Sequence, residues 1–129
     1  MTNQELIDQA TQARESAYAP YSQFLVGAAL LGKSGKVYQG CNVENASYGL
    51  TNCAERVAIG NAVSQGESEF ELLAISVKGG GSPCGACRQV INEFCTPDFR
   101  ILMADEKGQL VKEMTLGELL PESFGPQSL

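Results

Sequence analysis

The chain has 129 residues, with 15 acidic and 9 basic side chains, five cysteines and no histidine. This length suits one compact domain, so we expect residues 1–129 to form a single domain. The net charge of -6 argues against a nucleic-acid partner, because DNA and RNA binding relies on Lys and Arg at the phosphates. The absence of histidine excludes a Ser-His-Asp triad and an imidazole general base.

The chain shows no membrane or export signal. No apolar run approaches the ~20 residues that span a bilayer, and residues 1–14 are polar with helical periodicity rather than a signal-peptide pattern. An odd number of cysteines in such a chain makes a disulfide framework a poor explanation. We therefore expect a cytoplasmic protein without a membrane partner, whose cysteines serve a metal or catalytic site.

The first half of the chain predicts a helix followed by a β-hairpin. Apolar residues at helical spacing predict a helix from Thr2 to about Tyr18, capped by Thr2 or Asn3. An apolar run of strand length covers residues 24–31, turn residues follow at 32–36, and β-forming residues occupy 37–43. This succession predicts two antiparallel strands.

The second half alternates helices and strands. Helical spacing predicts helices over 52–64, 84–94 and 116–120, and apolar runs predict strands over 72–77, 100–104 and up to 112. The resulting β-β-α-β-α-β order predicts a sheet covered by helices, with crossover helices that begin at Cys53 and Cys84.

Three cysteines lie at these helix starts. Cys84 and Cys87 form a Cys-x-x-Cys pair after Pro83, which places both sulfurs on one face of the first helical turn. The positive end of a helix dipole lowers a thiol pKa and favours the thiolate that zinc requires. If the two crossover helices lie side by side, Cys53 completes a set of three thiolates.

Three protein ligands with an open fourth position are typical of a catalytic zinc site, whereas structural sites usually have four. Cys41 lies in a strand-like segment and Cys95 lies ~12 Å along the helix, so neither is well placed as a fourth ligand. Both are expected to be small buried apolar residues. Glu55 could move protons at the open position, and Arg56 could donate hydrogen bonds to the ligand sulfurs and offset their charge.

Other interpretations of these residues stay open at this point. A Cys-x-x-Cys pair alone is also typical of a redox dithiol or of structural cysteines. Glu55 could simply complement the helix dipole, and Arg56 could be an exposed helix arginine.

Four motifs resemble those of the small cytidine deaminases, and the resemblance extends from about Tyr18 to Leu120. The Cys-Ala-Glu and Pro-Cys-x-x-Cys elements form the signature of zinc nucleobase and nucleoside deaminases. The matching segments are 24–29 (FLVGAA), 40–48 (GCNVENASY), 53–56 (CAER) and 82–89 (SPCGACRQ).

This resemblance implies a three-layer α-β-α fold with a central mixed five-stranded sheet, and one Zn²⁺ per chain held by Cys53, Cys84 and Cys87. The implied activity is hydrolytic deamination of cytidine and deoxycytidine to the uridine counterparts, with release of ammonia, in pyrimidine salvage. Zinc would activate a water molecule for attack on ring C4, and Glu55 would carry its proton to ring N3 and then to the departing amine.

The resemblance also implies a nucleoside pocket. Asn42 and Glu44 would bind the ribose hydroxyls, the Ala54 N–H would bind the base O2, the Cys84 carbonyl would meet the amine, and Phe24 would stack on the pyrimidine. Without the resemblance, Phe24 would be assigned to the core, and Asn42 and Glu44 to a solvated strand and turn.

The family is typically a homotetramer with sites shared between subunits, and the resemblance makes Tyr48 and Phe124 candidates for the shared wall. Two alternatives stay open. One is deamination of a related aminopyrimidine nucleoside such as blasticidin S. The other is a non-catalytic binding module stabilised by a closed four-ligand zinc site.

Overall fold

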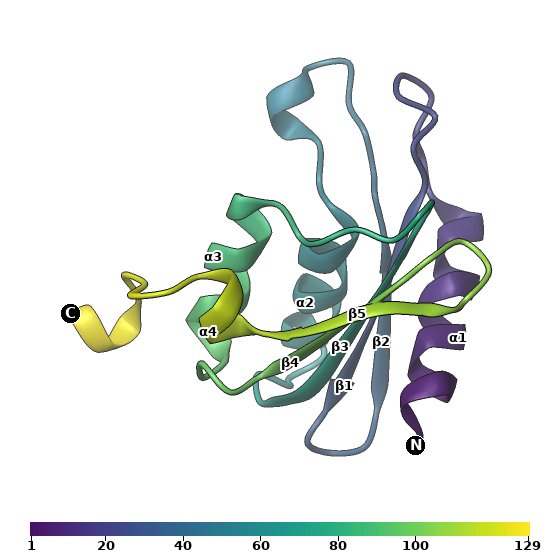
Figure 1. Cartoon of the computed structure of the whole chain (residues 1–129). Coiled ribbons are helices and arrows are strands. Elements are labelled where there is room, and N and C mark those ends of the chain that lie inside the picture. Colours follow the sequence, from purple (N-terminus) through teal and green to yellow (C-terminus); the bar gives the residue numbers. More distant parts are fainter.

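The computed structural model describes residues 1–129, which are built around one five-stranded sheet (Figure 1). The β3–β4 pair is parallel, whereas β1–β2, β1–β3 and β4–β5 are antiparallel. The predicted mixed sheet with an N-terminal hairpin is confirmed. In the order β2-β1-β3-β4-β5 across the sheet, the strand bounds are Val37–Cys41, Val26–Gly32, Phe70–Val77, Arg100–Ala104 and Leu110–Thr115.

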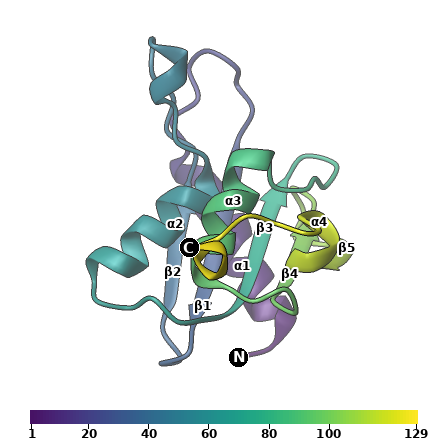
Figure 2. The same cartoon turned by 90° about the vertical axis from the view of Figure 1, so that its left-hand side faces the viewer.

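Helices cover both faces of this sheet. Figures 1 and 2 show α1 (Asn3–Ala13) on one face, with α2 (Ala54–Ser64) and α3 (Gly85–Phe94) together on the other. The predicted three-layer α-β-α arrangement is therefore confirmed. None of the helices combines the length and apolar character needed to cross a bilayer. The short elements are α4 (Leu116–Leu119) and the 3-10 turns η1 (Arg14–Ser16), η2 (Tyr48–Leu50) and η3 (Pro126–Ser128).

The central strands carry apolar side chains on both faces, because successive residues of a strand point to opposite sides. Ala28 and Leu30 of β1 and Leu73 of β3 pack into the cluster that contains the α2 and α3 residues. Ala29 and Ala74, their neighbours along the strands, pack into the cluster that contains the α1 residues. Burial on both faces explains the continuous apolar runs of these two strands.

Close contact between α2 and β2 depends on Gly40. A Cβ atom at this position would lie 2.4 Å from the Ala54 carbonyl oxygen and 2.4 Å from the Ala58 nitrogen. Only glycine lets the two backbones approach this far. The first turn of α2, which follows Cys53, is thereby fixed against the sheet.

Three predicted boundaries near the site are wrong, one of them the start of the first strand, which is Val26 rather than residue 24. The first helix ends at Ala13 rather than near Tyr18, because residues 14–16 tighten into η1 and Tyr18 pairs with the chain after β2. The Tyr18 N–H donates to the Asn42 carbonyl at 2.9 Å, and the Glu44 N–H donates to the Tyr18 carbonyl at 2.9 Å.

The second strand is also shorter than predicted, since it ends at Cys41. At this point side-chain hydrogen bonds of Asn42 join the backbone contact from its N–H to the Val26 carbonyl at 3.3 Å. Its Oδ1 accepts from the Val26 N–H at 3.0 Å, and its Nδ2 donates to the Phe24 carbonyl at 2.7 Å. Asn42 and Glu44 therefore lie just beyond β2, and Phe24 lies just before β1.

Candidate metal centre and adjoining cavity

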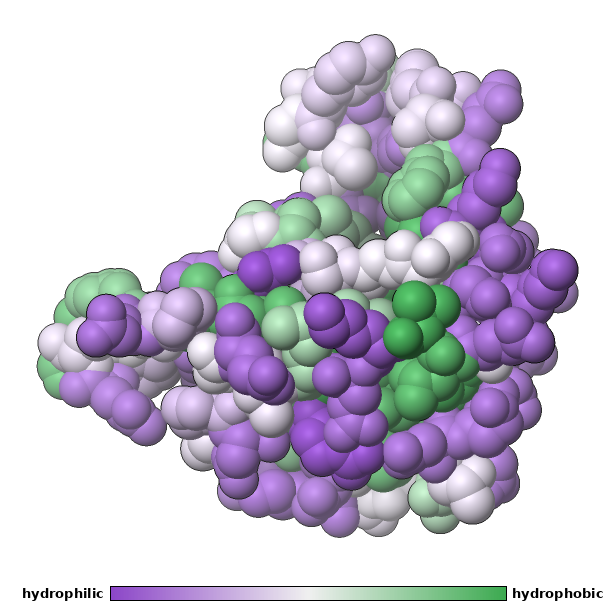
Figure 3. Space-filling view, in the orientation of Figure 1, coloured by the Kyte–Doolittle hydropathy of each residue, from purple (hydrophilic) through white to green (hydrophobic).

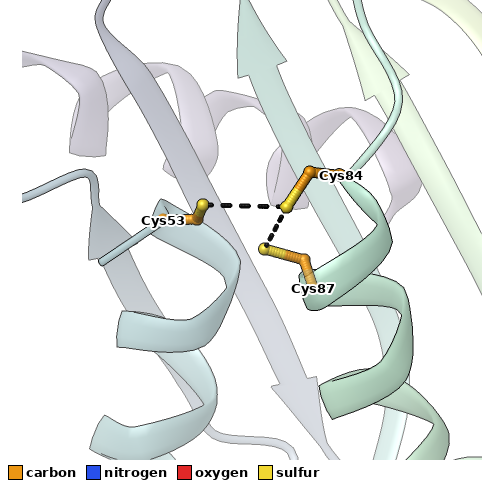
Figure 4. Close-up of side chains that lie close together, drawn as sticks. All are labelled: Cys53, Cys84 and Cys87. Atoms are coloured by element: carbon orange, nitrogen blue, oxygen red, sulfur yellow. Dashed lines mark hydrogen bonds between the residues drawn. The ribbon is translucent and has the colours of Figure 1, made fainter. Parts of the chain in front are cut away.

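The starts of α2 and α3 converge on one point. Cys53 is the N-cap residue of α2 and Cys84 that of α3, and neither cap makes a side-chain hydrogen bond to its helix. Cys87 lies in the first turn of α3 and is fully buried. Figure 4 shows the three sulfur atoms directed toward one another from the two helix ends.

The distances between these sulfurs fit a zinc ion. The Cys53 and Cys84 Sγ atoms are 3.9 Å apart, the Cys84 and Cys87 Sγ atoms are 3.5 Å apart, and all three lie within 4.8 Å of one another. Tetrahedral zinc with Zn–S bonds of about 2.3 Å requires sulfurs about 3.8 Å apart. No histidine, carboxylate or further cysteine joins the cluster, and three protein ligands are the number typical of a catalytic zinc site.

The two remaining cysteines stand apart from this cluster. Cys41 ends β2, and Cys95 follows α3 at its opposite end. Burial raises the pKa of both thiols, that of Cys95 to about 12. They are therefore neutral, partly buried side chains, unlike the reactive thiolates of a metal site.

The surroundings of Cys53 favour its thiolate. The proximity of Cys87 and contact with Arg56 lower the pKa of Cys53 to about 5. The Arg56 Nη2 atom donates to the Cys53 sulfur at 3.3 Å and to the Thr51 carbonyl at 3.5 Å. Its Nε atom is buried without a partner. The guanidinium therefore faces the Cys53 thiolate, where its charge offsets that of the sulfur.

Glu55 is the only buried carboxylate in the chain. It lies in the first turn of α2 with 4% of its surface exposed. Burial is the main cause that raises the pKa of Glu55, and the charge of the neighbouring Cys53 adds to the effect. A raised pKa makes a carboxyl group better suited to general acid–base catalysis than an exposed one.

A cavity of about 480 Å³ adjoins the cysteines. It brings together residues from the 22–26 and 42–44 segments, the start of α2 and the loop before α3. Most of the site residues predicted from sequence lie on its wall: Phe24, Asn42, Glu44, Cys53, Ala54, Glu55 and Cys84.

Four predicted site residues do not line this cavity: Cys87 and Arg56, which belong to the cysteine cluster and its contacts, and the two aromatic residues Tyr48 and Phe124. Tyr48, in η2, is 75% exposed, and its ring centroid lies 6.0 Å from that of Tyr21. Phe124 is 64% exposed on the C-terminal segment, which projects from the body of the molecule (Figure 1). One chain alone therefore does not bring either ring to the cavity.

Sequence reasoning missed several residues of the wall. Ser22, Thr51 and the 80–82 segment line the cavity, and Arg88 holds the loop before α3 through the Pro83 carbonyl at 2.7 Å. Ser22 donates its hydroxyl hydrogen to Glu44, which follows it by 22 positions. No local spacing rule connects residues so far apart, and only the pairing of the two segments reveals the contact.

Residues 1–103 match a family model described as the cytidine and deoxycytidylate deaminase zinc-binding region. The fold, the match and the three-cysteine cluster define a zinc-binding deaminase, with Cys53, Cys84 and Cys87 placed to hold the ion.

Relatives that match along nearly their whole length show which zinc-binding deaminases this chain is similar to. A cytidine deaminase of Sporosarcina psychrophila is 48% identical over 100% of this chain and 96% of its own length. A cytidine deaminase of Halalkalibacterium halodurans is 49% identical over 100% of this chain and 98% of its own length. The 1.6 Å crystal structure of cytidine deaminase from Burkholderia pseudomallei is 48% identical, with a TM-score of 0.91 over 96% of this chain and 100% of that one. The chain belongs to the cytidine deaminase family.

Proposed function

We propose that the chain deaminates cytidine and deoxycytidine hydrolytically. Water adds to the ring carbon that bears the amine, the carbon–nitrogen bond breaks, and ammonia leaves with uridine or deoxyuridine as the other product. The observation that carries this proposal is the meeting of three cysteine sulfurs and one buried carboxyl group at the wall of a nucleoside-sized cavity.

The chemistry divides between the metal and one side chain. Cys53, Cys84 and Cys87 would hold zinc, which would act as a Lewis acid and make water nucleophilic near neutral pH. Glu55 takes up the water proton, delivers it to ring N3 and later passes a proton to the amine, which leaves as ammonia. Arg56 offsets the negative charge of three thiolates, which would otherwise weaken the acidity of the water.

The remaining wall residues hold the nucleoside. Ala54 opens α2, so its N–H has no acceptor within the helix and can donate to the base O2. The Cys84 carbonyl accepts from the Arg88 N–H at 2.9 Å and keeps a lone pair for the exocyclic amine. Phe24 stacks on the pyrimidine, and Asn42 and Glu44 bind the ribose hydroxyls.

We further propose that residues 1–129 act as one deaminase domain within a homotetramer. The end of the projecting C-terminal segment shows apolar patches among polar surface (Figure 3), and Phe124 and Leu129 of this segment are exposed. Such a segment is stabilised when a second copy covers it. Tyr48 and Phe124 then complete the wall of neighbouring sites.

The substrates place this reaction in pyrimidine salvage, and five unpaired cysteines suit the reducing conditions of the cytoplasm.

The direct test is product analysis with purified, zinc-loaded protein. Cytidine and deoxycytidine are expected to give uridine, deoxyuridine and one ammonia per nucleoside consumed. A Cys84→Ala variant purified in the same way controls for contaminating host deaminase. Turnover of blasticidin S without turnover of cytidine would move the assignment to another aminopyrimidine nucleoside, and no turnover of either would favour a non-catalytic zinc module.

A further inference from the structure

The side chain of Glu44 is already engaged by the segment that carries Phe24. Its Oε1 accepts from the Tyr21 N–H at 3.0 Å and from the Ser22 N–H at 3.1 Å, and its Oε2 accepts from the Ser22 hydroxyl. These hydrogen bonds lower the pKa of Glu44, that from the Ser22 hydroxyl most of all. The carboxylate is therefore charged and fixed in orientation.

One acceptor site of Glu44 stays free. An ionised carboxylate has about four lone-pair sites, and the Tyr21 and Ser22 donors occupy three. The carboxylate can accordingly accept one further hydroxyl, and the Ser22 contact decides where that free site points.

Ser22 also contacts the backbone of Phe24, two residues further along the same segment. Its Oγ atom accepts a hydrogen bond from the Phe24 N–H at 3.0 Å. One hydroxyl group thus joins the carboxylate proposed to bind the sugar to the backbone of the residue proposed to stack on the base. No other side chain in the structure makes both contacts.

The backbone between Ser22 and Phe24 has a strained conformation that hydrogen bonds must stabilise. Gln23 has φ 58, in the left-handed region that non-glycine residues rarely adopt. Its N–H donates to the Ala19 carbonyl at 2.9 Å, which closes a tight turn before Phe24. A strained turn keeps its shape only when the surrounding contacts hold it, and the Ser22 hydroxyl supplies two of them.

We propose that Ser22 is a positioning residue that couples sugar recognition by Glu44 to the placement of Phe24. This inference rests on the proposed function, because it assumes that a nucleoside occupies the cavity. It predicts that loss of the Ser22 hydroxyl weakens the discrimination between nucleosides with and without the 2′- and 3′-hydroxyl groups.

The chain contains a matched control for this arrangement. In the turn between β1 and β2, the Ser34 N–H and hydroxyl donate to the Glu67 carboxylate, with the N–H contact at 2.9 Å and the hydroxyl contact at 2.5 Å. This pair lies outside the cavity. Removal of the Ser34 hydroxyl therefore reports the purely structural effect of breaking such a contact.

The test compares cytidine with 2′,3′-dideoxycytidine, which lacks the 2′- and 3′-hydroxyls of the sugar. For wild type, Ser22→Ala, Ser22→Thr and Ser34→Ala, kcat and KM are measured on both nucleosides. In Ser22→Ala we expect the preference in kcat/KM for cytidine to shrink about tenfold, mainly through KM. Ser22→Thr keeps the hydroxyl and should keep the preference, and Ser34→Ala should leave it unchanged. If Ser22→Ala does not fold, Ser22→Val takes its place.

An unchanged preference in a folded Ser22→Ala would overturn the coupling while the proposed function stands. Equal losses in Ser22→Ala and Ser34→Ala would do the same, because they would show a structural effect only. A wild-type protein that turns over neither nucleoside would instead overturn the proposed function, and this inference with it.

Discussion

The helix starts of this chain fall into two kinds. Thr2 caps α1 and Thr115 caps α4, each in a reciprocal capping box with a glutamate three residues later. Cys53 and Cys84 stand in the same positions on α2 and α3, and neither caps its helix through the side chain. A cap of the first kind contributes about 1 kcal/mol to stability.

This difference shows that α2 and α3 lack the stabilising side-chain caps of α1 and α4 at the positions where their cysteines form the metal site. At α1 and α4 the first-turn N–H groups find partners within the helix start. At α2 and α3 the cap side chains turn toward a common point, and some first-turn donors stay available to a ligand. Glu55 and Arg56 belong to the uncapped group, since both lie in the first turn of α2.

The largest effect is expected when a helix start that carries a zinc ligand is converted into one that is capped by its own side chain. Ser is a good N-cap residue, so Cys84→Ser should cap α3 but remove a zinc ligand. We expect loss of bound zinc and of cytidine turnover, and a metal-free form at least as stable as metal-free wild type. Elemental analysis measures the bound zinc, and urea unfolding of the two metal-free proteins compares their stability. Zinc retention at one ion per chain would remove Cys84 from the ligand set.

Glu55→Gln should abolish proton transfer and leave the helix start intact. A general acid–base residue contributes ~10²–10⁴-fold to the rate, so kcat on cytidine should fall by that factor. Zinc content and unfolding midpoint should stay near those of wild type, since Gln has nearly the same shape. Normal turnover by this variant would refute the assigned role of Glu55.

Arg56→Gln tests the contact between a guanidinium and a ligand sulfur. Removal of a hydrogen-bond partner of a metal ligand typically weakens metal affinity ~10–100-fold, and competition with a chelator measures that affinity. The matched control is Arg100→Gln, which breaks the exposed Arg100–Glu113 ion pair at 2.6 Å. Equal zinc affinity in both variants would make Arg56 an ordinary helix residue.

The smallest effect is expected at a capped start. Thr2→Ala should lower the free energy of unfolding by about 1 kcal/mol and leave kcat, KM and zinc content unchanged. Urea unfolding followed by circular dichroism measures the first quantity. A change in turnover would show that α1 is linked to the site, contrary to the division between the two kinds of helix start.

Sequence patterns over a few residues correctly predicted the order and approximate positions of helices and strands and the meeting of the three cysteines. The β4 strand occupies the predicted residues 100–104, and the starts of α2 and α3 bring Cys53, Cys84 and Cys87 together as expected. Hydrophobic periodicity and cysteine spacing act over a few residues, so they can be recognised without a structure.

Contacts between residues far apart in the chain could not be predicted from the sequence. The end of β2 at Cys41 depends on the Asn42 amide, which pairs with the backbone at Phe24 and Val26. The Ser22–Glu44 contact likewise requires the tertiary pairing of two loops. The roles of Tyr48 and Phe124 stay predictions, because one chain does not bring them to a cavity.

The most direct test of the account is a zinc titration of metal-free protein, kept reduced and assayed by the fall in ultraviolet absorbance of cytidine. We expect no turnover without metal, then a rise in proportion to added zinc that levels off at one ion per chain. Full turnover by metal-free protein, or one bound zinc per chain without any turnover, would contradict the assignment of a catalytic zinc to Cys53, Cys84 and Cys87.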